Sequence, residues 1–393
     1  MKFKKTSLPS TCSDCSDRAM NFSLNEVQSM LADSIEKFIA NDYDFETRQE
    51  HAASKLGYSR ETWRTFADLG WTAVPFSEDD GGFGGGPVDM MVIMERFGRG
   101  MVVEPYLANV VLAGGILQYA ASDAQKQEWL RPIIAGELQA TLAFAEPQGR
   151  YEIANIATVA RANGNGWMIN GTKSYVLNGG NSDLLIVPAR TAGEQTHQSG
   201  ISLFAIAADS DGVSIRDYET VDGQRAAEIS FNDVAVGSNK LIGDVDHGHA
   251  ALQQAVTDAT IAVCAEAVGI MRVLTDKTIE YSKNRSQFGV PIGSFQALQH
   301  RMVEMYTACE QSHSLLLWAV MTLADGGDDA SRAIHSIKYQ VGTAGKLVGE
   351  EAVQIHGGMG VTWELDVAHY FKRLTAIGQI FGNTDWHLDK LAT

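Results

Sequence analysis

QIHGGMG, residues 354–360, closes a segment whose composition favours one long helix, residues 330–355. The adjacent glycines Gly357 and Gly358 lack a Cβ atom, so the backbone there tolerates positive φ angles and the close approach of a ligand. A second unusual stretch, RSQFG at residues 285–289, places a guanidinium and an aromatic ring beside another glycine. Together the two stretches predict half of a binding site for a large, flat nucleotide.

Length and composition narrow the class of protein. The chain has 393 residues, of which 45% are hydrophobic and 20% charged, as in an ordinary folded protein of two or three domains. Its formal net charge of −17 argues against nucleic acid or an anionic membrane as the main partner. No apolar run approaches the roughly 18 residues that a membrane span needs. We therefore predict that the chain binds neither nucleic acid nor membrane. Only four cysteines occur, and Cys264 and Cys309 fall in helical patterns as core thiols, which fits a protein of the reducing cytoplasm.

The N-terminal segment is expected to lie outside the fold. Residues 1–19 are polar, and we predict that they form a disordered extension. They contain a lone CxxC pair, Cys12 and Cys15, with no second pair to complete a zinc site. The sequence from Ser23 to Glu26 resembles a capping box, and a helical pattern follows it.

The secondary-structure pattern of the sequence changes twice along the chain. Residues 20–140 predict helices, whereas residues 141–243 alternate short β-favouring runs with Asn-Gly turns, which is typical of an antiparallel sheet. Residues 244–393 predict a helical bundle of four long helices. We therefore expect an α+β protein with an N-terminal helical domain, a middle antiparallel β-domain and a C-terminal four-helix bundle. The expected strands are 167–170, 184–187, 201–206 and 228–231, and the expected bundle helices are 249–283, 294–324, 329–356 and 364–375.

Common catalytic and metal motifs are missing. A di-iron site in a helical bundle needs two Glu-x-x-His motifs, but the bundle region contains a single one, Glu310 to His313. The glycine-rich loop GGFGGGP, residues 81–87, lacks the Lys of a phosphate-binding P-loop, and no Rossmann fingerprint occurs. We therefore predict no metal site.

Taken together, the patterns resemble one family. RSQFGVPIGSFQ at residues 285–296 and QIHGGMGVT at residues 354–362, after a helical region and a β-region, are similar to motifs of the acyl-CoA dehydrogenases. Further stretches resemble the small subunit of pimeloyl-CoA dehydrogenase and subunits of heteromeric steroid or dicarboxylate dehydrogenases. The resemblance covers the chain from Met20 onward and implies FAD as the cofactor.

The resemblance also implies roles for single residues. Arg285 would contact the pyrophosphate of FAD, because a guanidinium binds phosphate through two parallel hydrogen bonds. Phe288 would pack by the adenine end. In the family such residues reach the flavin of a neighbouring subunit. The cofactor-binding residues implied are Arg285, Phe288, Phe295, Gln296, Gln354, Ile355, Gly357, Gly358 and Thr384.

The base that the family uses is absent. Family chemistry removes a proton from the acyl Cα while a hydride leaves Cβ for the flavin, so it needs a carboxylate. The position of the usual base is Gly382, and the alternative family position aligns with Ala259. The neighbouring Asp258 is a weak candidate, because one step along a helix turns a side chain by about 100°.

Groups that would hold the flavin ring are also replaced. The run that resembles the family's TEPGAGSD begins here with Ala145, which has no hydroxyl. Leu177 stands where the family has a threonine, although Tyr175 still offers a ring for stacking.

Three hypotheses remain open. In the first hypothesis, the chain is the subunit without a base in a heteromeric acyl-CoA dehydrogenase, and a sister subunit supplies the base. In the second, it is a self-sufficient homomeric FAD enzyme with Asp258 as a displaced base. In the third, it is a catalytically silent assembly subunit. The expected partners are a sister acyl-CoA dehydrogenase subunit, an acyl-CoA substrate such as a dicarboxylyl-CoA or a steroid thioester, and an electron-transferring flavoprotein.

Overall fold

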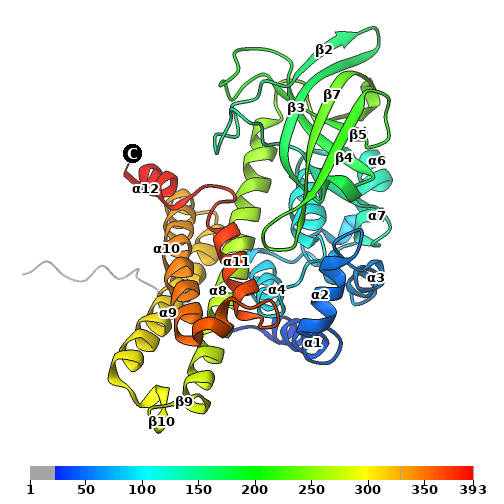
Figure 1. Cartoon of the computed structure of the whole chain (residues 1–393). Helices are drawn as coiled ribbons and strands as arrows, with labels where there is room; N and C mark the ends of the chain where they lie inside the picture. The colour runs from blue at the N-terminus through cyan, green and yellow to red at the C-terminus, as the bar shows by residue number, and fades with distance from the viewer. Residues whose placement is uncertain (1–22, 328, 393) are drawn as a thin grey trace, which may run out of the picture.

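The computed structural model describes residues 23–327 and 329–392. The predicted extension, residues 1–19, and its cysteines Cys12 and Cys15 lie outside the described residues. Figure 1 shows helices first, then a sheet, then helices again along the chain. This order confirms the predicted α+β architecture.

Short helices pack around α4 in the N-terminal region. The helix α1 begins at Glu26, and Asn25 caps it by accepting a hydrogen bond from the backbone of Gln28. The predicted capping box of Ser23 and Glu26 is therefore wrong, because Glu26 is already the first helical residue. The α-helices and π-helices are α1 (Glu26–Asp42), α2 (Phe45–Ala53), α3 (Arg60–Asp68), α4 (Pro87–Gly100), η3 (Leu107–Gly114), α5 (Gly115–Ala120), α6 (Asp123–Gln125), η4 (Lys126–Leu130) and α7 (Arg131–Ile134).

The middle region is a mixed sheet with its own apolar core around Phe204 and Phe231. Its strands are β1 (Ala140–Leu142), β2 (Val159–Asn163), β3 (Gly166–Leu177), β4 (Leu184–Arg190), β5 (Ile201–Ala207), β6 (Val213–Glu219), β7 (Arg225–Gly237) and β8 (Leu241–Ile242). They pair in the order β6-β7-β3-β2-β4-β5-β8, and β1 joins β4. The predicted antiparallel pairing is confirmed for most strand pairs of this sheet, but β1 and β2 each also pair with β4 in parallel, which was not predicted. Long connections separate these strands along the chain, which parallel pairing requires.

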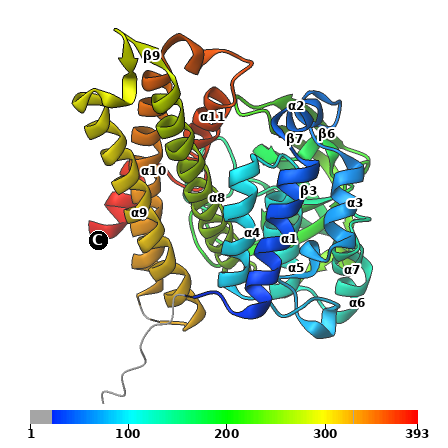
Figure 2. The ribbon, with the colours of Figure 1, turned by 90° about the horizontal axis from the view of Figure 1, so that it is seen from below.

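The C-terminal region is built on three long helices. These are α8 (His249–Asn284), α9 (Gln296–Ala324) and α10 (Ala330–His356), followed by α11 (Val367–Ile377) and α12 (Thr384–Ala392). Figure 2 shows α8 between α4 and the pair α9 and α10. Side chains are buried around most of its circumference, as expected for a helix enclosed by others. A hairpin, β9 (Ser286–Gln287) and β10 (Val290–Pro291), joins α8 to α9.

The bundle differs from the prediction at its end. The three long helices and α11 lie within a few residues of their predicted bounds, but α12 was not predicted. Its nine residues bury only one side chain, His387, so they carry no apolar stripe that a periodicity argument can detect. Within the described chain, we find no helix with both the length and the apolar character to cross a membrane. The remaining short 3-10 turns are η1 (Trp71–Ala73), η2 (Glu78–Asp80), η5 (Gly179–Asn181), η6 (Ser238–Lys240), η7 (Ile292–Ser294) and η8 (Gly357–Val361).

Candidate functional site

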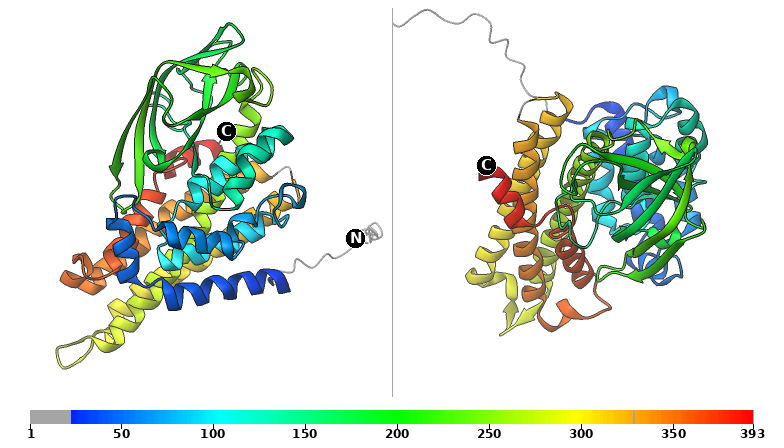
Figure 3. Two further views of the ribbon diagram at one scale, coloured as in Figure 1. Left: turned by 90° about the vertical axis from the view of Figure 1, so that its right-hand side faces the viewer. Right: turned by 90° about the horizontal axis from the view of Figure 1, so that it is seen from above.

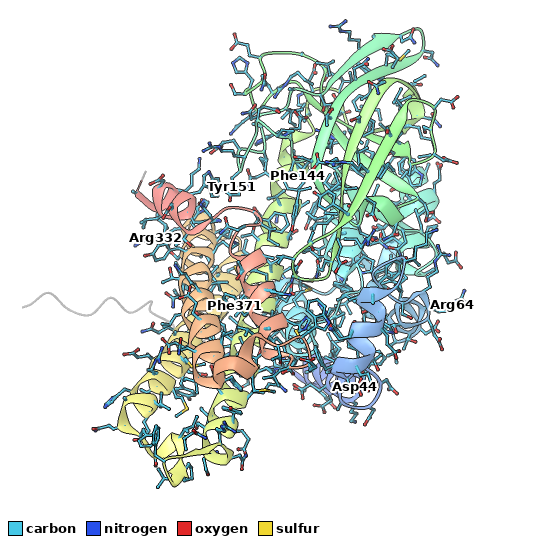
Figure 4. All side chains as sticks on the ribbon, in the orientation of Figure 1. Asp44, Arg64, Phe144, Tyr151, Arg332 and Phe371 are labelled. Carbon is cyan, nitrogen blue, oxygen red and sulfur yellow. The ribbon has the colours of Figure 1, made fainter. Side chains whose placement is uncertain are left out.

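A cavity of about 1050 Å³ lies between the sheet and the upper ends of the C-terminal helices. Its walls come from the loop after β1, from α8 and α10, and from the segment that leads into α12. Figure 4 labels two of its lining side chains, Phe144 after β1 and Tyr151 close to α12. Its size suits a small molecule with a bulky apolar part.

The position of the family's usual base, Gly382, is closed to any side chain. Gly382 is buried and has a φ angle of +115°, which L-residues rarely adopt. A Cβ atom there would lie 2.6 Å from Cε3 of Trp386 and 2.8 Å from Cδ2 of His387. The base is therefore excluded by local packing as well as absent from the sequence.

A buried lysine on α10 holds the backbone around Gly382 in place. The Nζ atom of Lys338 on α10 donates hydrogen bonds to the backbone oxygens of Ile377 at 2.9 Å and Gly382 at 2.7 Å. Only 1% of Lys338 is exposed, and burial lowers its pKa to about 8. Since α12 starts two residues after Gly382, the lysine also fixes where α12 begins.

Two histidines on the same wall are hydrogen-bonded to each other. The Nδ1 atoms of His335 and His387 lie 2.8 Å apart, and Nε2 of His387 lies 3.1 Å from the backbone oxygen of Phe381. Burial, then the nearby charge of Lys338, lowers the pKa of His387 to about 3, so its ring is neutral.

The alternative base position contributes nothing to the cavity. Ala259 is fully buried in the core, and the α8 side chains that line the cavity near it are Val256, Thr257 and Thr260. Asp258 points to a separate cavity of about 110 Å³ and accepts a hydrogen bond from the hydroxyl of Tyr119. Burial raises the pKa of Asp258. The structure therefore does not bring Asp258 into the large cavity.

Three carboxylates do line the large cavity, but each is already engaged. Glu146 accepts from Nζ of the buried Lys173 at 2.7 Å, and Asp222 accepts from Arg373 at 2.8 Å. Burial opposes their charge, yet these cations lower the pKa of both carboxyls. Glu152 accepts from Lys390 at 2.9 Å, and this contact lowers its pKa. None of the three is a free proton acceptor.

The wall that would face a flavin ring lacks side-chain hydroxyls at its two expected positions. Tyr175 sits at a bulge in the pairing of β3 with β7, has a φ angle of +51° and is 37% exposed. Leu177 lines the cavity with an apolar side chain, and Thr141 donates its hydroxyl to the Leu177 backbone oxygen at 2.6 Å. Ala145 offers no donor either. The residues present do not fit the hydrogen bonding that the family gives the ring.

The other predicted residues lie at the far tip of the bundle. Phe288 and Gly289 form the two-residue turn of the β9–β10 hairpin with φ angles of +56° and +83°. Phe288 is 93% exposed and packs only edge-on against Phe295, with ring centroids 6.1 Å apart. A large ring held outward by strained backbone is a feature that this chain's own packing does not explain.

Arg285 and Gln296 flank this hairpin. Arg285 directly follows α8 and Gln296 begins α9, and both side chains are exposed. The Arg285 guanidinium makes no ion pair within the part of the chain that the structure describes. It is therefore available to an anion from outside.

The glycine turn lies beside the tip. The ring of Tyr281 on α8 stacks on His356 at the end of α10, with centroids 4.3 Å apart. A Cβ atom added at Gly357 or Gly358 would meet nothing within 4 Å. Gln354 is exposed, so the bare backbone of the turn and one amide side chain face open space.

Two predicted residues do not join this group. Ile355 is 7% exposed and packs into the core, so only its backbone is near the turn. Thr384 starts α12 and lies against Gly342, which is about 18 Å from Gln354 along α10 at 1.5 Å per residue. Thr384 therefore belongs with the cavity end of the bundle.

Cavity and tip are far apart. Between Val256 at the cavity wall and Arg285 at the tip, α8 rises about 44 Å at 1.5 Å per residue. Figure 3 shows the tip extending from the bundle, away from the sheet. A single extended dinucleotide cannot bridge this distance.

Three residues that no sequence pattern indicated lie at or beside the cavity: His335 and His387 line it, and Lys338 is bound to the backbone of Gly382. Lys338, His335 and His387 gave no signal because a lone Lys or His in a helical pattern is normally a surface residue. Among the residues that the structure describes, no group of three or more His, Cys, Asp or Glu side chains could hold a metal ion.

Comparisons with known proteins agree on one family for three consecutive parts of the chain, from residue 25 onward. Residues 25–137, 141–234 and 246–393 match the models for the N-terminal, middle and C-terminal domains of acyl-CoA dehydrogenase. The chain is 29% identical over 367 residues to the probable acyl-CoA dehydrogenase YngJ of Bacillus subtilis, with 92% of this chain and 96% of YngJ covered.

Two solved structures have the same fold. The structure of PigA with FAD and proline has a TM-score of 0.88 at 26% identity, with 95% of this chain and 98% of that chain covered. A chain of the ChsE4-ChsE5 complex from Mycobacterium tuberculosis has a TM-score of 0.86 at 25% identity, with the same coverage.

Proposed function

We propose a role for this chain within the family to which it belongs, the acyl-CoA dehydrogenases, which are FAD-dependent oxidoreductases. In this proposal, the chain is the subunit without a base in a complex of two unlike chains. The sister subunit would supply the carboxylate that removes the proton from the acyl Cα. This chain would supply the tip of its bundle to the FAD that the sister subunit holds.

One observation carries the proposal. The groups suited to a nucleotide lie at the tip, about 44 Å along α8 from the cavity of about 1050 Å³. In the cavity itself, Gly382 leaves no room for a base, and Ala145 and Leu177 give no side-chain donor. The tip therefore complements a cofactor that another chain holds.

Each tip residue has a physical role in this proposal. Arg285 would bind a phosphate oxygen pair, since its guanidinium is exposed and planar. Gly357 and Gly358 would let the nucleotide approach the backbone, because no atom of this chain fills the space where a Cβ would lie. Phe288 would cover one face of the adenine.

The bound FAD would accept the hydride that leaves the acyl Cβ. This chain's contribution is then to hold the nucleotide and to keep water from that side. The complex would pass its electrons to an electron-transferring flavoprotein, the acceptor that family membership implies. A complex of unlike chains among the similar structures, ChsE4 with ChsE5, supports the heteromeric arrangement.

The test is co-expression with the sister chain, followed by measurement of flavin per complex. Arg285→Ala should remove most of the flavin, because the nucleotide loses a charge-assisted contact worth at least tenfold in affinity. Arg216→Ala is the matched control, since Arg216 is an exposed arginine on β6 of the sheet.

Three outcomes would decide against the proposal. Flavin content that is unchanged by Arg285→Ala would show that the tip does not reach the cofactor. Full flavin and turnover in a preparation without this chain would favour the silent assembly subunit. A yellow, active preparation of this chain alone would favour the homomeric enzyme.

A further inference from the structure

The cavity of this chain keeps its volume although the groups for flavin chemistry are missing from it. It measures about 1050 Å³, and its lining is mainly apolar. The inference below rests on the proposed function in one respect, that this cavity holds no catalytic flavin ring. A cavity of this size with a mainly apolar surface is typical of a site for a drug-sized ligand.

Flat rings form two walls of the cavity. Phe144 and Phe381 lie nearly parallel, with centroids 6.2 Å apart and planes 20° from each other. On the α12 side, Tyr151 packs against Trp386 at 5.9 Å. These side chains lose little conformational freedom when a ligand packs on them, and they favour a rigid ring body over a flexible chain.

The hydrogen-bond pattern fixes which proton each cavity histidine carries. The Phe381 backbone oxygen can only accept, so Nε2 of His387 carries the proton and its Nδ1 is an acceptor. His335 must then donate from Nδ1, because the two Nδ1 atoms are 2.8 Å apart. Burial lowers the pKa of His335 and keeps the ring neutral. Its Nε2 atom is left with a lone pair, which accepts a hydrogen bond.

One cation on the cavity wall has no carboxylate. Arg150 lines the cavity from a turn with a φ angle of +47°, and it forms no ion pair among residues 23–327 and 329–392. The cavity's carboxylates, in contrast, are each occupied by Lys173, Lys390 or Arg373. Arg150, an exposed side chain at the cavity, is therefore a cation that no carboxylate of the described residues pairs with.

We propose that this cavity binds, without turning it over, an apolar ring compound that carries a carboxylate and a hydroxyl. Arg150 pairs with the carboxylate, and His335 accepts the hydrogen bond of the hydroxyl. The ring body packs between the aromatic walls.

Three probes separate the two polar contacts. Deoxycholate has a ring body, a carboxylate and hydroxyls; its methyl ester lacks the charge, and 5β-cholanate lacks the hydroxyls. Binding is measured by calorimetry on the full chain and on its complex with the sister subunit. Wild-type protein should bind deoxycholate in the micromolar range, and both other probes at least tenfold more weakly.

Variants assign the contacts to residues. Arg150→Gln should weaken deoxycholate at least tenfold and leave the methyl ester unchanged, whereas His335→Phe should weaken deoxycholate and leave 5β-cholanate unchanged. Arg161→Gln on the exposed face of β2 is the control and should change nothing. Absence of binding to the wild type, or unchanged binding in Arg150→Gln, overturns the inference.

Flavin content separates this inference from the proposed function. Arg285→Ala should remove flavin from the complex and keep deoxycholate binding. Arg150→Gln should keep the flavin and weaken deoxycholate binding. If Arg285→Ala leaves the flavin while Arg150→Gln weakens deoxycholate, the proposed function fails and the ligand site stands. If flavin bound to this chain alone competes with deoxycholate, the ligand site fails.

Discussion

Replacing Gly382 by glutamate restores the family's base in the sequence, and we expect it to give a less stable protein with no dehydrogenase activity. The backbone there has a φ angle of +115°, and a Cβ would lie 2.6 Å from a carbon of Trp386. Unfavourable φ costs about 1–2 kcal/mol, and overpacking of a filled site costs about 1–3 kcal/mol. The free energy of unfolding should therefore fall by about 2–5 kcal/mol.

Urea unfolding monitored by circular dichroism measures this loss from the midpoint and slope of the transition. Gly382→Ala should show most of the effect, since the first added carbon already meets Trp386 and His387. Gly358→Ala is the matched control, because a Cβ there meets nothing within 4 Å, and its stability should change by less than about 0.5 kcal/mol.

Activity is measured as acyl-CoA-dependent reduction of a dye by the purified chain. A Gly382→Glu protein as stable as the wild type would refute the packing argument. A Gly382→Glu protein that gained turnover would refute the wider claim that this cavity has lost more than its base.

Three further predictions concern single side chains. The pKa of Lys338 falls from 10.5 to about 8 on folding, so the unfolded chain binds more protons than the folded chain between these pH values. The free energy of unfolding should therefore rise with pH in that window by up to about 3 kcal/mol. Urea titrations at several pH values measure this rise, and Lys338→Met should abolish it. Lys173→Met leaves Glu146 buried without its cation and should cost about 3–5 kcal/mol in the same assay, and a loss below about 1 kcal/mol would contradict this. Phe288→Ala should leave the urea midpoint unchanged, because the side chain is 93% exposed, yet lower the flavin content of the complex; an unchanged flavin content would count against its role at the tip.

The order of helices, sheet and helices could be predicted from the sequence because each region has a distinct pattern. The long helices carry apolar side chains at helical spacing, and the strands lie between Asn-Gly turns. The parallel pairing of β1 and β2 with β4 could not be predicted, because it depends on which strands meet after long connections.

The candidate site divides in the same way. The tip could be predicted, since Arg285, Phe288 and the glycine pair lie in two compact motifs. The lack of room for a side chain at Gly382 could not be predicted, because His387 and Trp386 on α12 fill that space. This helix is too short and too exposed to leave a periodic signal in the sequence. Likewise nothing in the local sequence shows that Lys338 is buried and bound to two backbone oxygens.

The central claim is that this chain offers its tip to a flavin that another chain holds, and holds none in its own cavity. The most direct measurement is the ratio of flavin to protein, from absorbance, for this chain alone and for its complex with the sister subunit. The account predicts a colourless chain alone and one FAD for each pair of unlike chains, lost on Arg285→Ala. One FAD bound to each copy of this chain purified alone would contradict it.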